Sequence, residues 1–173
     1  MRLNRSDFFI RQTICALSFF LMGSTFASQI EVCKSAPALF YCKVSGGKDL
    51  AICPSYIDGE LAGIQYRFGQ EGKKGLVFPG SGFGFKEFKS NHFFRYQVDY
   101  KLLKFSVGSY VYSLYSNYDG EDVEGAVRSA GVVVSSLSGS PDVRIPCVKI
   151  YVDKLEEVMS HVECDVSDAM GCT

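Results

Sequence analysis

Few side chains in the sequence are placed for nucleophilic chemistry. The serine most like a nucleophile lies in Gly80-Ser81-Gly82-Phe83-Gly84. A nucleophile elbow of the Gly-x-Ser-x-Gly type needs glycine two positions before the serine, where the chain has Pro79. The dinucleotide-binding fingerprint also fails, because Phe85 occupies the position of its last glycine. We therefore interpret residues 80–85 as a loop between strands and predict that Phe83 and Phe85 contact a partner.

Candidates for acid–base catalysis and metal binding are equally weak. The histidines are His92, at the start of a predicted strand, and His161, which is followed by Glu163 and Cys164. Zinc needs three or four ligands, and a cysteine in a disulfide is no longer a thiolate. The acids of residues 119–124 lack the spacing of a calcium-binding loop and predict an exposed charged turn. The sequence therefore predicts no catalytic residue, no metal and no cofactor.

The first 27 residues have the pattern of a secretory signal peptide. Three arginines come first, an apolar run covers residues 14–22, and Thr25-Phe26-Ala27 ends the segment with small residues at its outer positions. This run is shorter than the roughly 20 apolar residues that span a membrane. We predict that residues 28–173 form a single periplasmic or secreted domain with no transmembrane segment.

The cysteines agree with export to an oxidising compartment. One of the seven, Cys15, lies in the predicted signal peptide. The other six form two groups, near the start and near the end of the remaining chain: Cys33, Cys42, Cys53, Cys147, Cys164 and Cys172. An even set predicts three disulfides, although the sequence leaves their pairing open. We expect at least one bond between the groups, involving Cys147, because closing a loop of about 100 residues contributes about 4 to 5 kcal/mol.

Composition and charge argue against a nucleic-acid partner. The chain has 18 basic and 19 acidic residues, and loss of residues 1–27 would remove three arginines and one aspartate. The remaining 15 basic and 18 acidic residues give a net charge of −3. Nucleic-acid binders need clustered Lys and Arg, whereas these basic residues are scattered among aromatic and acidic ones. The 14 Phe, 10 Tyr and 17 Gly favour strands joined by tight turns.

Short alternating or aromatic runs, broken by turn residues, predict an antiparallel meander. The predicted strands cover residues 39–44, 50–53, 64–68, 76–78, 91–100, 105–107, 110–115 and 130–135. Ser45-Gly46-Gly47-Lys48 and Gly69-Gln70-Glu71-Gly72 are expected to turn the first two hairpins, because glycine adopts the positive φ of tight turns.

The pattern changes near the C-terminus. Apolar residues there recur at helical spacing: Val152, Leu155, Val158, Met159 and Val162. This spacing predicts a short amphipathic helix over residues 153–163 that lies on the sheet. The predicted fold is therefore mainly β: an antiparallel meander forming a curled sheet, a sandwich or a barrel, with one short C-terminal helix and three disulfides.

Tyrosines are densest in the predicted strand 110–115. Because side chains alternate between the faces of a strand, Tyr115 must face away from Tyr110 and Tyr112. Exposed tyrosines are frequent at protein interfaces, where they lose little entropy on binding. We predict these three tyrosines as binding residues beside Phe83 and Phe85, with packing on the sheet as the alternative interpretation.

One stretch carries a resemblance to known proteins. Cys42 is followed by Gly47-Lys48-x-Leu50-x-Ile52-Cys53, then by Tyr66-Arg67-Phe68-Gly69, and then by Phe78-Pro79. This order resembles small exported proteins of Gram-negative bacteria that have no assigned activity. The resemblance implies a periplasmic or secreted β-rich domain and transfers no catalytic residue.

Absent catalytic motifs, a disulfide scaffold and aromatic loops favour recognition over turnover. We expect an exported, non-enzymatic binding protein whose partner is another protein, for example an inhibitor or immunity-type protein that acts on a cell-wall hydrolase or a toxin. Two alternatives stay open. A small secreted hydrolase acting on carbohydrate or lipid would show convergent carboxylates, or a histidine near a serine, in a concave site. A small-molecule carrier would show an apolar cavity.

Overall fold

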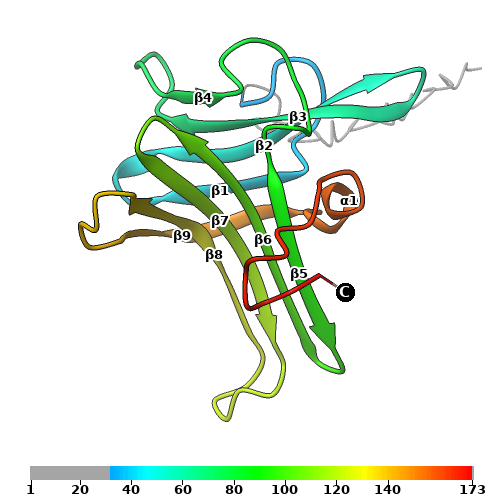
Figure 1. Ribbon diagram of the computed structural model, residues 1–173, viewed down its shortest axis with the longest axis vertical. Coiled ribbons are helices and arrows are strands. Elements are labelled where there is room, and N and C mark those ends of the chain that lie inside the picture. Colours follow the sequence, from blue (N-terminus) through cyan, green and yellow to red (C-terminus); the bar gives the residue numbers. More distant parts are fainter. Residues whose placement is uncertain (1–31, 173) are drawn as a thin grey trace, which may run out of the picture.

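The computed structural model describes residues 32–172, so the predicted signal peptide lies outside the described part. Within residues 32–172 the strands are β1 (Phe40–Val44), β2 (Asp49–Ile57), β3 (Glu60–Gly69), β4 (Leu76–Phe78), β5 (Lys89–Arg95), β6 (Val98–Val107), β7 (Tyr110–Asp119), β8 (Val127–Ser136) and β9 (Val143–Asp153). They form one antiparallel sheet in the order β4-β3-β2-β1-β9-β8-β7-β6-β5. The sheet is strongly curled (Figure 1). The mainly β prediction is confirmed, with the curled sheet as its form.

The sheet consists of two meanders that meet at one strand pair. Strands β1 to β4 form the first meander and β5 to β9 the second, and β1 pairs with β9 along its whole length, from Phe40 opposite Asp153 to Val44 opposite Cys147. The disulfide between Cys42 and Cys147 links the same two strands, with 5.8 Å between the Cα atoms and 105 residues between the cysteines in sequence. The expected long-range bond involving Cys147 is confirmed.

The core lies on the concave face of the curled sheet, where alternate side chains of most strands point inward. Its centre is a set of stacked aromatic rings around Phe105. The ring centroid of Phe105 lies 4.4 Å from that of Phe78, 4.7 Å from Tyr66 and 5.1 Å from Tyr112. Such pairs contribute about 0.5 to 1.5 kcal/mol each beyond the burial of their area. This packing fixes the curvature, because it joins rings from both meanders.

At both ends of the sheet, other segments of the chain pair with part of a strand edge. The connection between β4 and β5 crosses from one edge to the other, and Gly84 within it exchanges two backbone hydrogen bonds with Ile64 of β3, at 3.2 and 3.1 Å. Gly63 is required beside this contact, because a Cβ there would lie 2.9 Å from the Gly84 nitrogen. Covered edges do not pair with other chains, which protects a sheet protein from aggregation.

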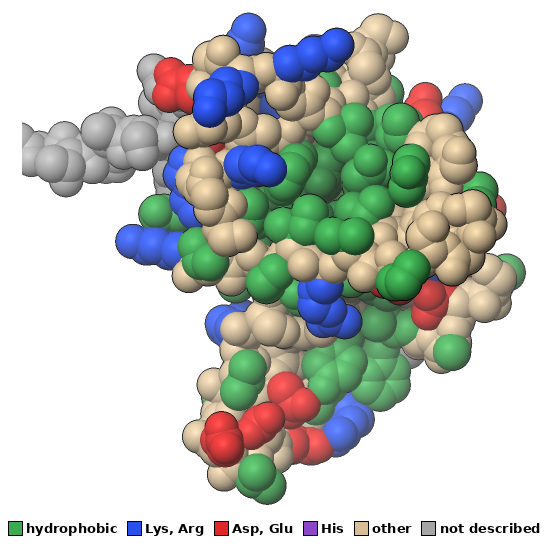
Figure 2. Space-filling view, turned by 90° about the vertical axis from the view of Figure 1, so that its left-hand side faces the viewer, with side chains coloured by type: hydrophobic (Ala, Val, Ile, Leu, Met, Phe, Trp, Pro, Cys, Tyr) green, Lys and Arg blue, Asp and Glu red, His purple; other side chains and the backbone are tan. Residues whose placement is uncertain are grey.

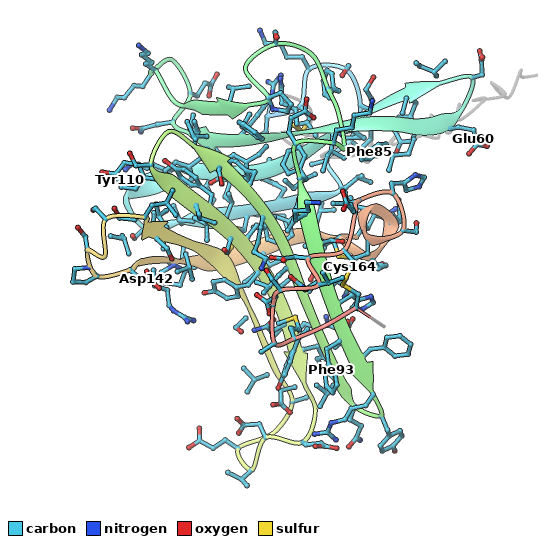
Figure 3. The ribbon with its side chains drawn as sticks, in the orientation of Figure 1. Glu60, Phe85, Phe93, Tyr110, Asp142 and Cys164 are labelled. Atoms are coloured by element: carbon cyan, nitrogen blue, oxygen red, sulfur yellow. A yellow bond between two sulfur atoms is a disulfide. The ribbon has the colours of Figure 1, made fainter. Side chains whose placement is uncertain are left out.

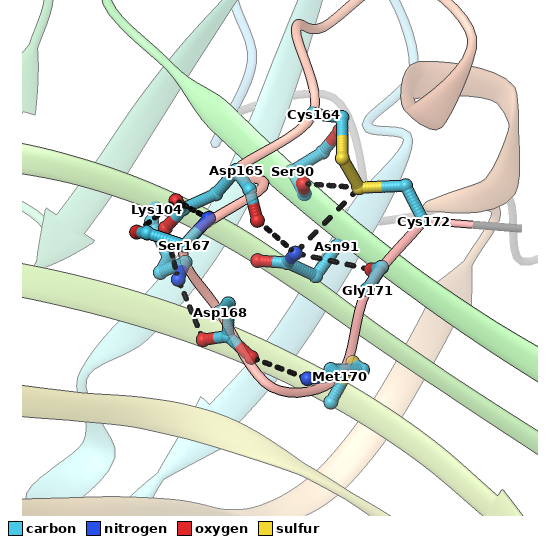
Figure 4. Close-up of polar contacts among 10 residues, drawn as sticks. All are labelled: Ser90, Asn91, Lys104, Cys164, Asp165, Ser167, Asp168, Met170, Gly171 and Cys172. Atoms are coloured by element: carbon cyan, nitrogen blue, oxygen red, sulfur yellow. Dashed lines mark hydrogen bonds and ion pairs between the residues drawn. A yellow bond between two sulfur atoms is a disulfide. The ribbon is translucent and has the colours of Figure 1, made fainter.

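The free edge of β5 is covered by the C-terminal segment (Figure 4). Ser90 and His92 form parallel bridges with Cys164 and Cys172, which are joined by a disulfide. The buried Asn91 side chain donates hydrogen bonds to the carbonyls of residues 165 and 171, at 2.8 and 3.1 Å. We call residues 164–172 the C-terminal loop. It is attached to the sheet by backbone bridges and an amide side chain, and its two ends are joined by a disulfide.

One predicted strand is wrong, and the predicted C-terminal helix is confirmed but shorter than expected. Residues 91–100 are not one strand, because the chain reverses at Tyr96 and Gln97, where Gln97 has a φ of 61°. The predicted helix over 153–163 is only a short α1 (Glu156–Met159), since β9 continues to residue 153 and turns follow the helix. The helical spacing of apolar residues nevertheless identified core positions, because Leu155 and Val158 are fully buried.

Two features of the sheet had no counterpart in the predicted strands. Strand β9 lies at the middle of the sheet, although Pro146 interrupts its sequence. The hairpin of β2 and β3 turns at Asp58 and Gly59, with φ values of 52° and 86°.

None of the helical segments in residues 32–172 has the length and hydropathy needed to cross a membrane.

Removal of the long-range disulfide should lower the stability more than removal of the short-range one. The chain-entropy model assigns about 5 kcal/mol to the loop closed by Cys42–Cys147 and about 2.5 kcal/mol to the short loop closed by Cys164–Cys172. We expect Cys42→Ala/Cys147→Ala to lower the free energy of unfolding in guanidinium chloride by about twice as much as Cys164→Ala/Cys172→Ala. An equal or smaller loss for the first pair would contradict the role given to the junction of β1 and β9.

Candidate binding surfaces

The loop of residues 80–85 is held rigidly against β3. The buried Gln65 side chain donates from Nε2 to the carbonyl oxygens of Pro79, at 3.0 Å, and Gly82, at 2.9 Å. Phe83 is 37% exposed, whereas Phe85 is half-buried and stacks on His161 with 5.2 Å between ring centroids. Only Phe83 of the two predicted contact residues is therefore available at the surface of this loop.

The three tyrosines predicted on β7 have different environments. Tyr110 is half exposed, and Tyr112 packs against the core through its stack on Phe105. Tyr115 is buried on the opposite face of the strand, where the Arg144 guanidinium lies 5.3 Å from its ring centroid. The expected alternation is thus found, but two of the tyrosines are packing residues. Tyr110 and Phe85 also lie far apart in Figure 3, so the predicted residues do not form one surface.

A larger exposed apolar group lies where the long hairpins of the second meander project beyond the rest of the molecule (Figure 1). We call residues 92–101 and 116–129 the arm. At the end of the first hairpin Phe94 is 58% exposed and Tyr96 is 82% exposed. The neighbouring hairpin adds Val123, which is fully exposed, and Val127. We call these four residues the arm tip.

Polar contacts lock the two hairpin ends of the arm together. Arg95 donates from both terminal nitrogens to both carboxylate oxygens of Glu121, each at 2.5 Å. The backbone N–H of Gly120 donates to the carbonyl of Gln97 at 2.7 Å, and the Tyr100 hydroxyl donates to Asp119, also at 2.7 Å. A Cβ at position 120 would meet the Gln97 backbone at 3.1 Å, so this close approach favours glycine. The exposed rings are therefore presented on a fixed scaffold.

The ionisable groups beside the arm form a compact polar cluster. His92 Nε2 lies 2.8 Å from Asp99 Oδ1, the buried Lys101 ammonium binds the other oxygen of Asp99, and Glu156 lies 3.9 Å from Lys101. Burial opposes ionisation of Asp99, but hydrogen bonds from Lys101 and His92 outweigh it and lower the pKa of Asp99. Together with Phe94 and Tyr118, His92 and Asp99 line a hollow of about 380 Å³.

Two carboxylates of the C-terminal loop have lowered pKa values, the opposite of what general acid catalysis needs. A glycosidase needs one carboxyl group whose pKa is raised. Asp165 and Asp168 share the Lys104 ammonium, at 2.5 and 2.7 Å. Hydrogen bonds from Lys104 lower the pKa of both groups, to about 2 for Asp165. Within residues 32–172 no group of three potential ligands is placed to hold a metal ion.

The arm was not predicted from the sequence, because residues 91–100 were interpreted as one continuous strand and the turn at Tyr96 and Gln97 was missed. Tyr96 and Gln97 are not typical turn residues, so no signal in the sequence marked the hairpin end. The run Phe93-Phe94-Arg95-Tyr96 did show an unusual density of aromatic residues beside a charge. The acidic residues 119–124 were correctly predicted as an exposed turn.

Comparisons of the chain with protein-family models, with curated proteins and with solved structures find no match. The resemblance to small exported proteins therefore stays a prediction, and the functional argument rests on the geometry of the molecule.

The ion pair of Lys104 with Asp165 in the C-terminal loop should make the stability of the protein depend on pH. Because the folded pKa of Asp165 is held near 2, its contribution to stability is complete above the ordinary aspartate pKa of about 4 and is lost as the pH falls towards 2. Lys104→Gln should raise the pKa of Asp165 towards its ordinary value, as followed by carbon-detected NMR titration of the carboxyl group. The control Lys89→Gln removes a neighbouring lysine that binds Glu163 instead. A titration midpoint unchanged by Lys104→Gln would show that the ion pair does not form in solution.

Proposed function

We propose that this protein is an exported, non-enzymatic binding protein that docks onto another protein through the arm tip. The observation that carries the proposal is the pair of highly exposed aromatic side chains, Phe94 and Tyr96, on one hairpin end that the ion pair of Arg95 and Glu121 locks to the neighbouring hairpin end. Binding energy in protein interfaces is concentrated in a few aromatic and arginine residues. A scaffold ordered before binding loses less entropy on association.

The charge around the arm tip indicates the chemistry of the partner. The second hairpin carries four acids close together: Asp119, Glu121, Asp122 and Glu124. The arm has three basic residues: Arg95 is paired with Glu121, Lys101 is buried and paired with Asp99, and Arg128 lies over the Tyr118 ring. Figure 2 shows acidic side chains gathered at the lower end of the molecule, beside hydrophobic ones. This arrangement fits a basic protein with an apolar cleft, because complementary charge speeds association and selects the partner.

Export supports the same proposal. The three disulfides formed by the cysteines of residues 32–172 are stable in an oxidising compartment, such as the periplasm or the extracellular medium. A basic cell-wall hydrolase or an incoming toxin is a partner of the required chemistry there. The protein would then act as an inhibitor or immunity-type protein by occupying the cleft of that partner.

The test is binding in the producing organism. A photo-reactive phenylalanine analogue at position 96 should cross-link to a partner that mass spectrometry identifies as a basic protein. With the purified partner, Phe94→Ser/Tyr96→Ser should weaken binding at least about 30-fold, since truncation of interface aromatics costs about 1 to 2 kcal/mol each or more. The affinity of the wild type should also fall with added salt.

The matched control is Leu137→Ser, which removes an exposed side chain from the turn between β8 and β9 and should bind like the wild type. Phe83→Ser tests the loop of residues 80–85 in the same assay. Loss of binding in Phe83→Ser but not in the arm-tip variant would move the contact surface to that loop. Cross-linking at position 96 to no protein at all would overturn the proposal.

A further inference from the structure

A second candidate site lies on the opposite meander, away from the arm. A cavity of about 500 Å³ opens on the convex, outer face of the sheet, and we call it the outer pocket. Its floor is formed by outward side chains of β1, β2, β3 and β9, and its walls by Val32 and Lys34 on one side and residues 69–75 on the other. This volume lies within the range of small-molecule sites, about 300 to 1,000 Å³.

Among residues 32–172, the partners of the central cation of the outer pocket are neutral groups. Arg67 is half-buried, and its Nε donates to Gln65 Oε1 at 2.9 Å while Nη1 donates to the Val32 carbonyl at 3.2 Å. A guanidinium carries five N–H donors, so donors are left for a ligand. No carboxylate of residues 32–172 forms an ion pair with Arg67. A partly desolvated charge without a counter-ion favours the binding of an anion.

The Arg67 side chain is held in place before any ligand arrives. Gln65, which accepts its Nε hydrogen bond, is buried and anchored to the carbonyls of Pro79 and Gly82. The Val32 carbonyl adjoins Cys33, which is bonded to Cys53 of β2. Fixed donors aimed at a ligand lower the entropy lost on binding.

The surrounding charges leave the outer pocket positive. Its cationic lining residues are Lys34, Lys43, Arg67 and Lys73, and its acidic ones are Asp49 and Glu71. Asp49 is occupied by Lys43, at 2.7 Å, and by the Tyr41 hydroxyl, at 2.8 Å. Three cations therefore face a single acid that is not paired within the pocket.

The pocket also has an aromatic wall. Tyr41 and Tyr151 are stacked with 5.0 Å between ring centroids, and Tyr151 remains partly exposed beside the pocket. The Lys149 ammonium also lies over this ring, 4.8 Å from its centroid, so a planar or apolar ligand body meets the exposed edge of Tyr151 while its anionic group meets the guanidinium. Leu76 and Val77 complete the apolar part of the lining.

We propose that the outer pocket binds a small organic anion, whose carboxylate or phosphate group is held by Arg67 with Lys73 and whose ring or apolar body packs on Tyr151. This site is independent of the arm, since its residues belong to the first meander, to β9 and to the N-terminal segment that precedes β1. The two proposals can therefore fail separately.

The experiment is an NMR titration of the isotope-labelled protein with benzoate and with phenyl phosphate. Both anions should give saturable shifts of the Gly69, Gly72 and Gly75 amides, which line the pocket, and of the Arg67 Nε–H. Benzamide, the neutral analogue of benzoate, should bind at least about tenfold more weakly. Tighter binding of one anion identifies the group that the site prefers, carboxylate or phosphate.

Two substitutions locate the site. Arg67→Gln should weaken anion binding at least about tenfold, and Lys73→Gln, at an exposed position, should weaken it by a smaller factor without affecting the fold. The matched controls are Arg144→Gln and Lys86→Gln, which remove cations outside the pocket and should bind like the wild type. The proposal is overturned if neither anion gives saturable shifts, if benzamide binds equally well, or if Lys73→Gln and Arg67→Gln both bind like the wild type.

Discussion

The pairing of β1 with β9 is the constraint on which the rest of the structure depends. Without it the chain would form two separate meanders, and β1 and β9 would each be an open edge strand. The pair is irregular, with register shifts beside Cys42 and Val44, and the disulfide between Cys42 and Cys147 bridges it at this irregular part. A covalent link at this point removes many open conformations from the unfolded ensemble. It also places the rings of both meanders around Phe105, which holds the curl.

The two meanders carry different surfaces on this common core. In the second meander the strands continue past the core, and the projecting ends are stabilised by pairing with each other rather than by burial. In the first meander the outer face of the strands carries Arg67 beneath the N-terminal segment. Each surface is fixed by short-range contacts: the ion pair of Arg95 and Glu121 in one case, and the hydrogen bonds of Gln65 in the other. In both the arm and the outer pocket, exposed groups are held in fixed positions.

The strand pattern could be predicted where local chemistry was sufficient. Alternation identified most of the strands, and the even cysteine count indicated disulfides. Prediction failed where tertiary contacts override local preference. Gln97 adopts a positive φ without a glycine because Gly120 and the ion pair hold the turn. Strand β9 contains Pro146, which normally indicates an edge, yet Gly131 on β8 makes room for it: a Cβ there would lie 2.9 Å from the Pro146 Cα.

The candidate surfaces were harder to predict than the fold. Phe85, Tyr112 and Tyr115 are aromatic residues of the kind found at protein contacts, but in the curled sheet they pack inside the molecule. Exposure depends on which face of the sheet is concave, and the sequence does not specify the curl. The hairpin of β2 and β3 was also not predicted, although Asp58-Gly59 is a preferred dipeptide of tight hairpin turns.

The central claim is that the arm is ordered before it meets a partner, and backbone NMR relaxation of the free protein tests it most directly. If the ion pair of Arg95 and Glu121 and the contact of Gly120 with Gln97 hold the hairpin ends together, order parameters over residues 94–98 and 119–122 should approach the rigid-backbone value of about 0.85. Values below about 0.6 there, beside a rigid core sheet, would contradict a preformed binding surface.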